Sequence, residues 1–304
     1  MVLPIARPAV RYHGGKWLLA PWIISHFPAH ECYVEPFGGG ASVLLRKEPS
    51  PVEIYNDLDS EAVNFFRVLR DQPECLIRAV GLTPYSREEQ RGAYDTDAAS
   101  DLERARRFFV AAWQSFGASI HRKSGWRYMR TRRGRGNTPA DDWDTEDRLE
   151  AIARRLRRVG LENGRAETIM ARFDAPETLF YVDPPYTLAE RTARQRAVYA
   201  FEMDDAAHRS LARTLNGLSG AVVLSGYRSD LYDALYEGWE RHERSALANS
   251  IGVNKRRTVE CLWVKIPATP SSTVPVNDVP TAERSRAADA GDPVSTPVPA
   301  ERSE

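Results

Sequence analysis

The sequence predicts an α/β protein built on a largely parallel β-sheet. Short apolar runs alternate with amphipathic stretches, several of these runs end at glycine, aspartate or proline, and apolar residues make up 42% of the 304 residues. Strands that alternate with helices usually join in βαβ units, whose strands run parallel. A chain of this length and composition can bury one good core and a second, smaller one.

The elements follow from apolar periodicity and from the residues that end each run. A strand over 32–37 ends at Gly38-Gly-Gly40, and helical character follows over 41–47. The chain then predicts a strand over 52–55 and a helix over 61–70. Farther along, strands are expected over 179–182, 221–225 and 258–264, with Gly226 in a turn, and helices over 204–218 and 230–236. Asp204 or Asp205 is the expected cap of the first of these two helices.

The domain organisation follows from where this rhythm breaks. Residues 82–160 are rich in arginine and mostly helical or irregular in pattern, which indicates a module inserted into a domain formed by 1–81 and 161–266. Residues 267–304 hold seven prolines and no aromatic residue. Such a segment cannot offset the entropy of ordering, so a disordered tail is expected.

The charge is unevenly placed although the formal net charge is zero. Residues 104–135 hold ten Lys and Arg but no Asp or Glu, with four Trp, Phe and Tyr among 113–128. Phosphates attract such a patch and aromatic rings can stack on bases, so a polyanion partner is expected. A solvated helix face with a loop is the alternative, and the basic run by itself does not decide between them.

Several classes of protein are excluded by composition. No window approaches the roughly 18 consecutive apolar residues that a membrane-spanning helix needs, and the N-terminus has no apolar signal region. The three cysteines form no CxxC motif and no disulfide framework. Six His and three Cys show no metal-ligand spacing, so no metal is expected. We therefore expect a reduced, cytoplasmic protein.

Three groups of polar residues fall at the expected carboxyl ends of strands, where ligands bind in an open parallel sheet. Glu35-Pro-Phe-Gly-Gly-Gly40 offers a close backbone approach to a ligand. Asp57 can accept hydrogen bonds from ribose hydroxyls, although a helix cap is an equally good interpretation of this residue alone. Asp183-Pro-Pro-Tyr186 presents a carboxylate, a rigid backbone carbonyl and a ring, which suit an exocyclic amine and the base that carries it.

Together these motifs resemble the Dam-like DNA adenine-N6 methyltransferases. The resemblance covers about 11–265 and rests on six pieces that occur in order: Arg11-Tyr-His-Gly-Gly-Lys16, Tyr33-Val-Glu-Pro-Phe-Gly-Gly-Gly-Ala-Ser42, Asn56-Asp57, Tyr181-Val-Asp-Pro-Pro-Tyr186, Val222-Val-Leu-Ser-Gly-Tyr227 and Thr258-Val-Glu-Cys-Leu-Trp263. It implies a Rossmann-like domain that binds S-adenosylmethionine and an inserted helical module that recognises double-stranded DNA. The expected reaction is methyl transfer to N6 of a flipped-out adenine by direct displacement.

The resemblance also assigns residues. It places Asp183, Pro184 and Tyr186 at the target amine, and it makes Asp183 a neighbour of the cofactor as well. The residues that it implies for the cofactor pocket are Tyr12, Lys16, Phe37, Gly38 and Asp57. The residues expected on DNA, from the resemblance and the basic run, are Arg11, Arg122, Lys123, Arg127, Arg130, Arg132 and Arg133.

The sequence departs from the family pattern at two places and leaves some questions open. Arg165 stands where relatives often have an Asp that meets the cofactor adenine, with Asp174 as another candidate, and Lys265 stands where they often have Asn. The alternatives are a cytosine-N4 DNA methyltransferase and a non-catalytic DNA-binding protein on the same scaffold. A cytosine-C5 enzyme needs a nucleophilic Cys that typically follows Pro, whereas each Cys here follows Glu. The recognition site, a restriction endonuclease partner and the choice between monomer and dimer stay open.

Overall fold

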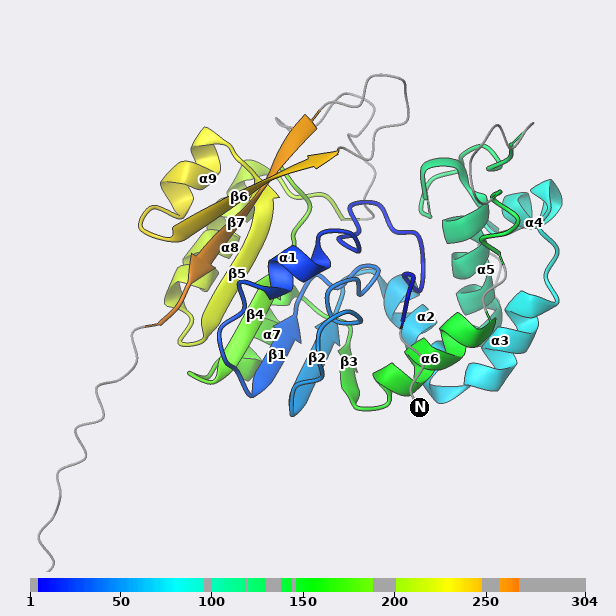
Figure 1. The fold of residues 1–304 in the computed structure, drawn as a ribbon, viewed down its shortest axis with the longest axis horizontal. Helices are drawn as coiled ribbons and strands as arrows, with labels where there is room; N and C mark the ends of the chain where they lie inside the picture. Colours follow the sequence, from blue (N-terminus) through cyan, green and yellow to red (C-terminus); the bar gives the residue numbers. More distant parts are fainter. Residues whose placement is uncertain are drawn as a thin grey trace, which may run out of the picture. The chain divides into compact units, whose positions relative to one another are not determined.

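The computed structural model describes residues 5–95, 100–118, 120–129, 138–143, 146–187, 201–247 and 257–267 (Figure 1). The expected tail, apart from Pro267, lies outside these residues. So do three of the arginines predicted to bind DNA, Arg130, Arg132 and Arg133.

The described residues form a seven-stranded sheet in the order β3-β2-β1-β4-β5-β7-β6. The strands are β1 (Cys32–Glu35), β2 (Val52–Asn56), β3 (Val159–Glu162), β4 (Thr178–Val182), β5 (Ala221–Tyr227), β6 (Glu240–Leu247) and β7 (Arg257–Lys265). Neighbours among β1 to β5 pair in parallel, whereas β7 runs antiparallel to both β5 and β6. The strand order reverses between β1 and β4, which is where an open sheet of this kind opens a crevice for a ligand.

The sheet is buried on both faces, which explains why its central strands read as continuous apolar runs. Alternate residues of β4 enter different core clusters: Leu179 and Tyr181 belong to one, Phe180 and Val182 to the other. The first cluster packs against α1 (Ala20–Ile24), α2 (Ser60–Asp71), α3 (Pro73–Gly81), α5 (Asp101–Gln114) and α6 (Glu146–Leu156). The second packs against α7 (Ala166–Phe173), α8 (Asp205–Gly217) and α9 (Asp230–Leu235).

The predicted insertion contributes α4 (Arg87–Gly92), α5, the 3₁₀ turn η1 (Phe116–Ala118) and α6. Helix α5 shares a core with α2, because the ring of Phe65 stacks on Phe108 and Phe109 at centroid distances of 5.5 and 6.0 Å. Strand β3 begins at Val159, before the expected end of the insertion. The boundaries at 81/82 and 160/161 stay predictions.

Three local expectations were wrong or incomplete. Residues 41–47 form turns rather than a helix, because Ala41 has φ +53° and the Leu44 N–H donates to the Glu35 carboxylate. Gly226 lies inside β5 and not in a turn. Strands β3 and β6 were not expected. Strand β6 reads Glu-Arg-His-Glu-Arg at its start, which carries no apolar alternation.

Two side chains have structural partners that explain their positions: Asp204, at the start of α8, and Lys265, at the end of β7. Asp204 caps α8 by accepting a hydrogen bond from the Ala207 N–H at 2.8 Å, as the sequence predicted. Lys265 donates from Nζ to the carbonyls of Leu215, Asn216 and Leu218. Because these carbonyls lie at the C-terminal end of α8, a cation there is favourable. This explains a lysine at the end of β7.

Candidate active site

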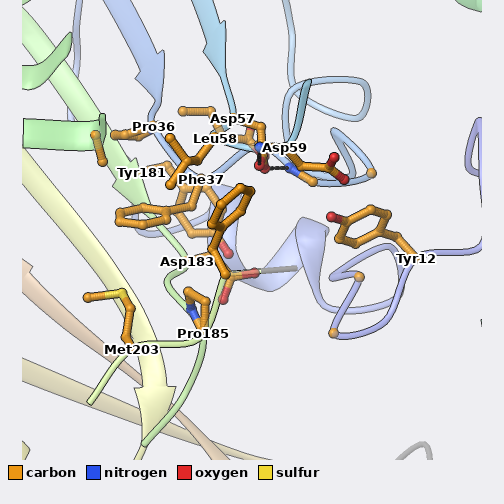
Figure 2. Close-up of a pocket in the computed structure, with 18 of the residues that line it drawn as sticks. Tyr12, Pro36, Phe37, Asp57, Leu58, Asp59, Tyr181, Asp183, Pro185 and Met203 are labelled. Atoms are coloured by element: carbon orange, nitrogen blue, oxygen red, sulfur yellow. Dashed lines mark hydrogen bonds between the residues drawn. The ribbon is translucent and has the colours of Figure 1, made fainter. Parts of the chain in front are cut away.

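A cavity of about 460 Å³ lies at the carboxyl ends of β1, β2 and β4. Figure 2 shows the side chains of Tyr12, Phe37 and Asp183 grouped around it. All six residues that the resemblance assigns to the cofactor pocket line this cavity: Tyr12, Lys16, Phe37, Gly38, Asp57 and Asp183. They come from four separate segments of the chain, which the topology of the sheet brings together.

The glycine turn after β1 is required by packing. A Cβ built on Gly38 would lie 2.1 Å from Cε2 of Tyr55, whose ring is fully buried. The Tyr55 hydroxyl donates to the Gly39 carbonyl at 2.8 Å, and Gly39 itself has φ +46°. Gly38 is therefore needed to admit the tyrosine ring beneath the turn, a reason that the sequence did not reveal.

Asp57 links the ends of β1 and β2. It accepts hydrogen bonds from the backbone N–H of Gly39 at 2.7 Å and of Asp59 at 2.8 Å (Figure 2). Burial raises the pKa of Asp57 to about 6, although these two hydrogen bonds oppose the shift. The cap of α2 is Asp59, which accepts from the Glu61 N–H, so the helix-cap interpretation of Asp57 was wrong.

Asp183 follows β4 and is fixed through one of its two oxygens. Lys16 Nζ and the Ser225 hydroxyl each lie 2.9 Å from Oδ1 of Asp183. The Ser225 hydroxyl also contacts that of Tyr181 at 3.0 Å. Both contacts with Asp183 are made to Oδ1. The carboxylate is therefore oriented from one side and keeps an acceptor atom for a ligand.

Lys16 is nearly buried, and its ammonium has several partners. Besides the contact with Asp183, Nζ donates to the Gly14 carbonyl at 2.9 Å and lies 4.7 Å from the centroid of the Tyr186 ring. It also lies 3.8 Å from Glu260, a residue of β7 that the sequence did not single out. A buried ammonium requires such neighbours, because an isolated charge is costly to remove from water.

Pro184 and Tyr186 do not line the cavity as the described residues form it, whereas Pro185 does. Tyr186 is buried. Its hydroxyl donates to Glu260, and its ring meets that of Tyr227 edge to face at a centroid distance of 4.6 Å. The expectation that this ring stacks on a target base stays a prediction.

Glu35 is a fully buried carboxyl group in the cavity wall. Burial raises its pKa to about 8, although hydrogen bonds from the Tyr33 hydroxyl and the Leu44 N–H oppose the shift. A carboxyl group with this pKa is largely neutral at pH 7. The cavity wall therefore carries less negative charge than the sequence suggests.

Among the described residues, a contact connects the range predicted to be an insertion, 82–160, to a residue that lines the cavity. His121 Nε2 lies 2.9 Å from Oδ2 of Asp59, which lines the cavity. Burial by itself lowers the pKa of His121, but the hydrogen bond and the charges of Asp59, Asp57 and Glu61 outweigh it and raise the pKa overall. No local pattern in the sequence marks this pair, because the two residues are distant in the chain.

The described residues predicted to bind DNA fall into two groups. Arg122 and Lys123 are exposed. Arg11 is largely buried near Arg127, and its pKa is lowered by burial and then by the charge of Arg127. Arg127 pairs with Asp142 at 2.7 Å. Their contact with DNA stays a prediction.

The two candidates for the adenine-contacting position differ in location. Arg165 precedes α7 and lines the cavity, with its side chain 75% exposed and 3.6 Å from Glu167. Asp174 instead accepts hydrogen bonds from the backbone of Ser219 and Gly220. Within the described ranges, no cluster of His, Cys, Asp and Glu is arranged to hold a metal ion. No helix there is long and apolar enough to cross a bilayer.

Comparisons with known proteins identify the family of the chain. A family model described as D12 class N6 adenine-specific DNA methyltransferase matches residues 12–250. A type II methyltransferase of Lactococcus lactis subsp. cremoris is 28% identical over 79% of this chain and 88% of its own length. DNA adenine methylases of Serratia marcescens and Vibrio cholerae are each 24% identical, over 83% and 82% of this chain and 92% and 93% of their own lengths. Because the family model spans most of the sequence, the chain belongs to the D12 class N6 adenine-specific DNA methyltransferases.

Proposed function

We propose that the protein transfers a methyl group from S-adenosylmethionine to N6 of an adenine that has been flipped out of double-stranded DNA. The observation that carries this proposal is the orientation of Asp183. Its Oδ1 is held by Lys16 and Ser225, while Oδ2 remains available beside the cavity. A carboxylate fixed in this way can accept a hydrogen bond from an exocyclic amine without first reorganising.

The cavity suits the methyl donor in size and charge. Its volume of about 460 Å³ is within the range of small-molecule sites. When bound, S-adenosylmethionine supplies an electrophilic methyl group on a positively charged sulfur. Two side-chain cations, Lys16 and Arg165, line the cavity among the described residues. Five carboxyl groups besides the largely neutral Glu35 line it as well: Asp57, Asp59, Glu167, Asp183 and Glu202. Carboxyl groups therefore outnumber the cations, which suits a positively charged donor.

Different residues of the chain hold different parts of the donor. Asp57 offers remaining lone pairs to ribose hydroxyls, because each carboxylate oxygen accepts more than one hydrogen bond. Tyr12 and Phe37 provide aromatic surface, and the turn at Gly38 lets a ligand approach the backbone. Lys16 holds Asp183 between this pocket and the target amine.

The amine is held by two acceptors. Asp183 and the Pro184 carbonyl each accept one N6–H, which draws the N6 lone pair out of conjugation with the ring. Direct displacement would form the bond from N6 to the methyl carbon as the bond from that carbon to sulfur breaks, with a neutral thioether leaving and N6 then losing one proton. No covalent enzyme intermediate is needed, so proximity and orientation supply most of the rate enhancement. Flipping the base costs a few kcal/mol, which hydrogen bonds and stacking in the pocket offset.

Recognition of DNA is assigned to residues 82–160. The basic residues of this range attract phosphates, and Arg122, Lys123 and Arg127 are the described members of the predicted set. Arg11 lies near Arg127 and adds a cation from the segment before Gly14.

A methyl-transfer assay tests the proposal. The full chain is incubated with S-adenosylmethionine labelled in its methyl group and with unmethylated DNA, and the DNA is then hydrolysed to nucleosides. Label in N6-methyladenine is the expected result. Label in N4-methylcytosine, or DNA binding without any transfer, would contradict it and favour one of the two alternatives.

A further inference from the structure

The direction of β7 brings a buried carboxylate to the edge of the sheet that carries the site. Ligands meet the carboxyl ends of the parallel strands, and β7 runs antiparallel to β5. The first residues of β7, rather than its last, therefore reach this edge. Glu260 lies there in register with Tyr227 at the end of β5, and only 4% of it is exposed.

Glu260 contacts two residues of the proposed site. Its Oε1 accepts the hydrogen bond from the Tyr186 hydroxyl and lies 3.8 Å from Lys16 Nζ. The same ammonium is 2.9 Å from Asp183 and 4.7 Å from the centroid of the Tyr186 ring. One buried cation is thus shared by two carboxylates and the face of an aromatic ring.

The two carboxylates around Lys16 also set the net charge beside the target amine. If Asp183 were the single carboxylate near Lys16, the two groups together would carry no net charge. The ammonium would then interact with Asp183 alone and would compete with a substrate amine for that carboxylate. Ionised Glu260 is a second carboxylate beside the same ammonium. Lys16, Asp183 and Glu260 together then carry one net negative charge. That charge favours the positive charge that develops on N6 during methyl transfer.

We propose that Glu260 is a positioning residue for the transfer reaction, acting through Lys16 and Tyr186 on Asp183. The proposal rests on the proposed function and adds to it a residue about 74 positions after Tyr186 in the chain. Glu260 does not line the cavity. Its effect is therefore expected on the rate of transfer and not on the binding of either substrate.

The decisive variant is Glu260→Gln, which keeps the volume and an oxygen that accepts from the Tyr186 hydroxyl but removes the charge. Single-turnover transfer is measured from pH 6 to 9, because burial raises the pKa of Glu260 and the proposed role requires the ionised group. We expect a rate loss of about tenfold or more, equal to at least about 1.4 kcal/mol. The KM for DNA, the Kd for S-adenosylmethionine and the Tm are expected to stay near wild type.

The matched control is Glu243→Gln, which removes a carboxylate of β6 that pairs with Arg241 at 3.1 Å. Its transfer rate is expected to equal that of the wild type. A merely structural Glu260 would tolerate the isosteric amide, so a wild-type rate in Glu260→Gln overturns the proposal. Should that variant unfold, Glu260→Asp replaces it, because it keeps the charge but moves the carboxylate away from Lys16 and Tyr186. A folded Glu260→Asp variant with a reduced transfer rate supports the proposal, and an unreduced rate overturns it.

The two proposals fail in distinguishable ways. A wild-type chain that places no methyl group on adenine in DNA overturns the proposed function. A wild-type chain that does so, together with an equally fast Glu260→Gln variant, overturns the role of Glu260 alone.

Discussion

The ammonium of Lys16 lies 2.9 Å from Oδ1 of Asp183. Lys16, which follows Gly14-Gly15, thus orients the carboxylate that follows β4, although 167 positions separate the two residues in the sequence. Ser225 of β5 donates to the same oxygen. Two distant segments therefore hold one oxygen of the carboxylate that follows β4.

Replacing Asp183 with Ala is expected to abolish methylation while DNA binding survives. The variant loses the acceptor for N6–H, and the loss of one well-placed polar group in an active site costs roughly a hundredfold to a thousandfold in rate. Transfer of labelled methyl groups and a DNA gel-shift titration measure the two properties. Asp205→Ala, at an exposed position in α8, is the control. Normal turnover in Asp183→Ala would refute the assignment.

The affinity for S-adenosylmethionine is expected to fall as the pH is lowered through about 6, the raised pKa of buried Asp57. Above this pH the carboxylate accepts hydrogen bonds from the ribose, and below it the protonated acid loses part of this capacity. If the protonated form does not bind, the affinity falls about tenfold per pH unit. Isothermal titration calorimetry between pH 7.5 and 5 measures the effect.

Two variants separate Asp57 from its neighbours in that titration. Asp57→Asn is expected to bind more weakly, with little dependence on pH in this range. His121→Gln removes the histidine that pairs with Asp59 and whose pKa is also raised. If His121→Gln, rather than Asp57→Asn, removed the pH dependence, the titrating group would be the histidine.

Replacing Gly38 with Ala is expected to destabilise the protein. The added Cβ would lie 2.1 Å from the ring of Tyr55, which is fully buried and cannot move freely. Overpacking of this kind costs about 1–3 kcal/mol, or more. Thermal unfolding followed by circular dichroism measures the change. Gly217→Ala is the matched control, because nothing lies within 4 Å of its Cβ; equal melting temperatures for the two variants would exclude the packing argument.

Joint replacement of Arg130, Arg132 and Arg133 with Ala is expected to weaken DNA binding and to flatten its dependence on salt. Each phosphate contact contributes about 0.9 to the slope of log K against log salt concentration, so three contacts account for at most about 2.7. Fluorescence anisotropy at several salt concentrations gives this slope. The matched control replaces Arg172, Arg209 and Arg213, which are exposed and lie outside residues 82–160. An unchanged slope in the first variant would make that run a bystander.

The alternation of strands and helices could be predicted from the amino-acid sequence alone, and so could the motifs that end β1, β2 and β4. These signals are local. Apolar runs mark buried strands, and a turn after a strand is written in glycine, aspartate or proline. For the same reason the six residues expected around the cofactor could be named before their positions were known, and all six line the cavity.

The residues that support these motifs could not be predicted in the same way, because their contacts depend on how the chain folds. Strand β6 is too charged to read as a strand and exists because β7 offers it a partner. Three contacts around the site join residues that are far apart in the chain, so no local pattern in the sequence reveals them. They are Ser225 with Asp183, His121 with Asp59, and Glu260 with Lys16. Hydrogen bonds and ion pairs depend on distance in space, and strand order and direction set that distance.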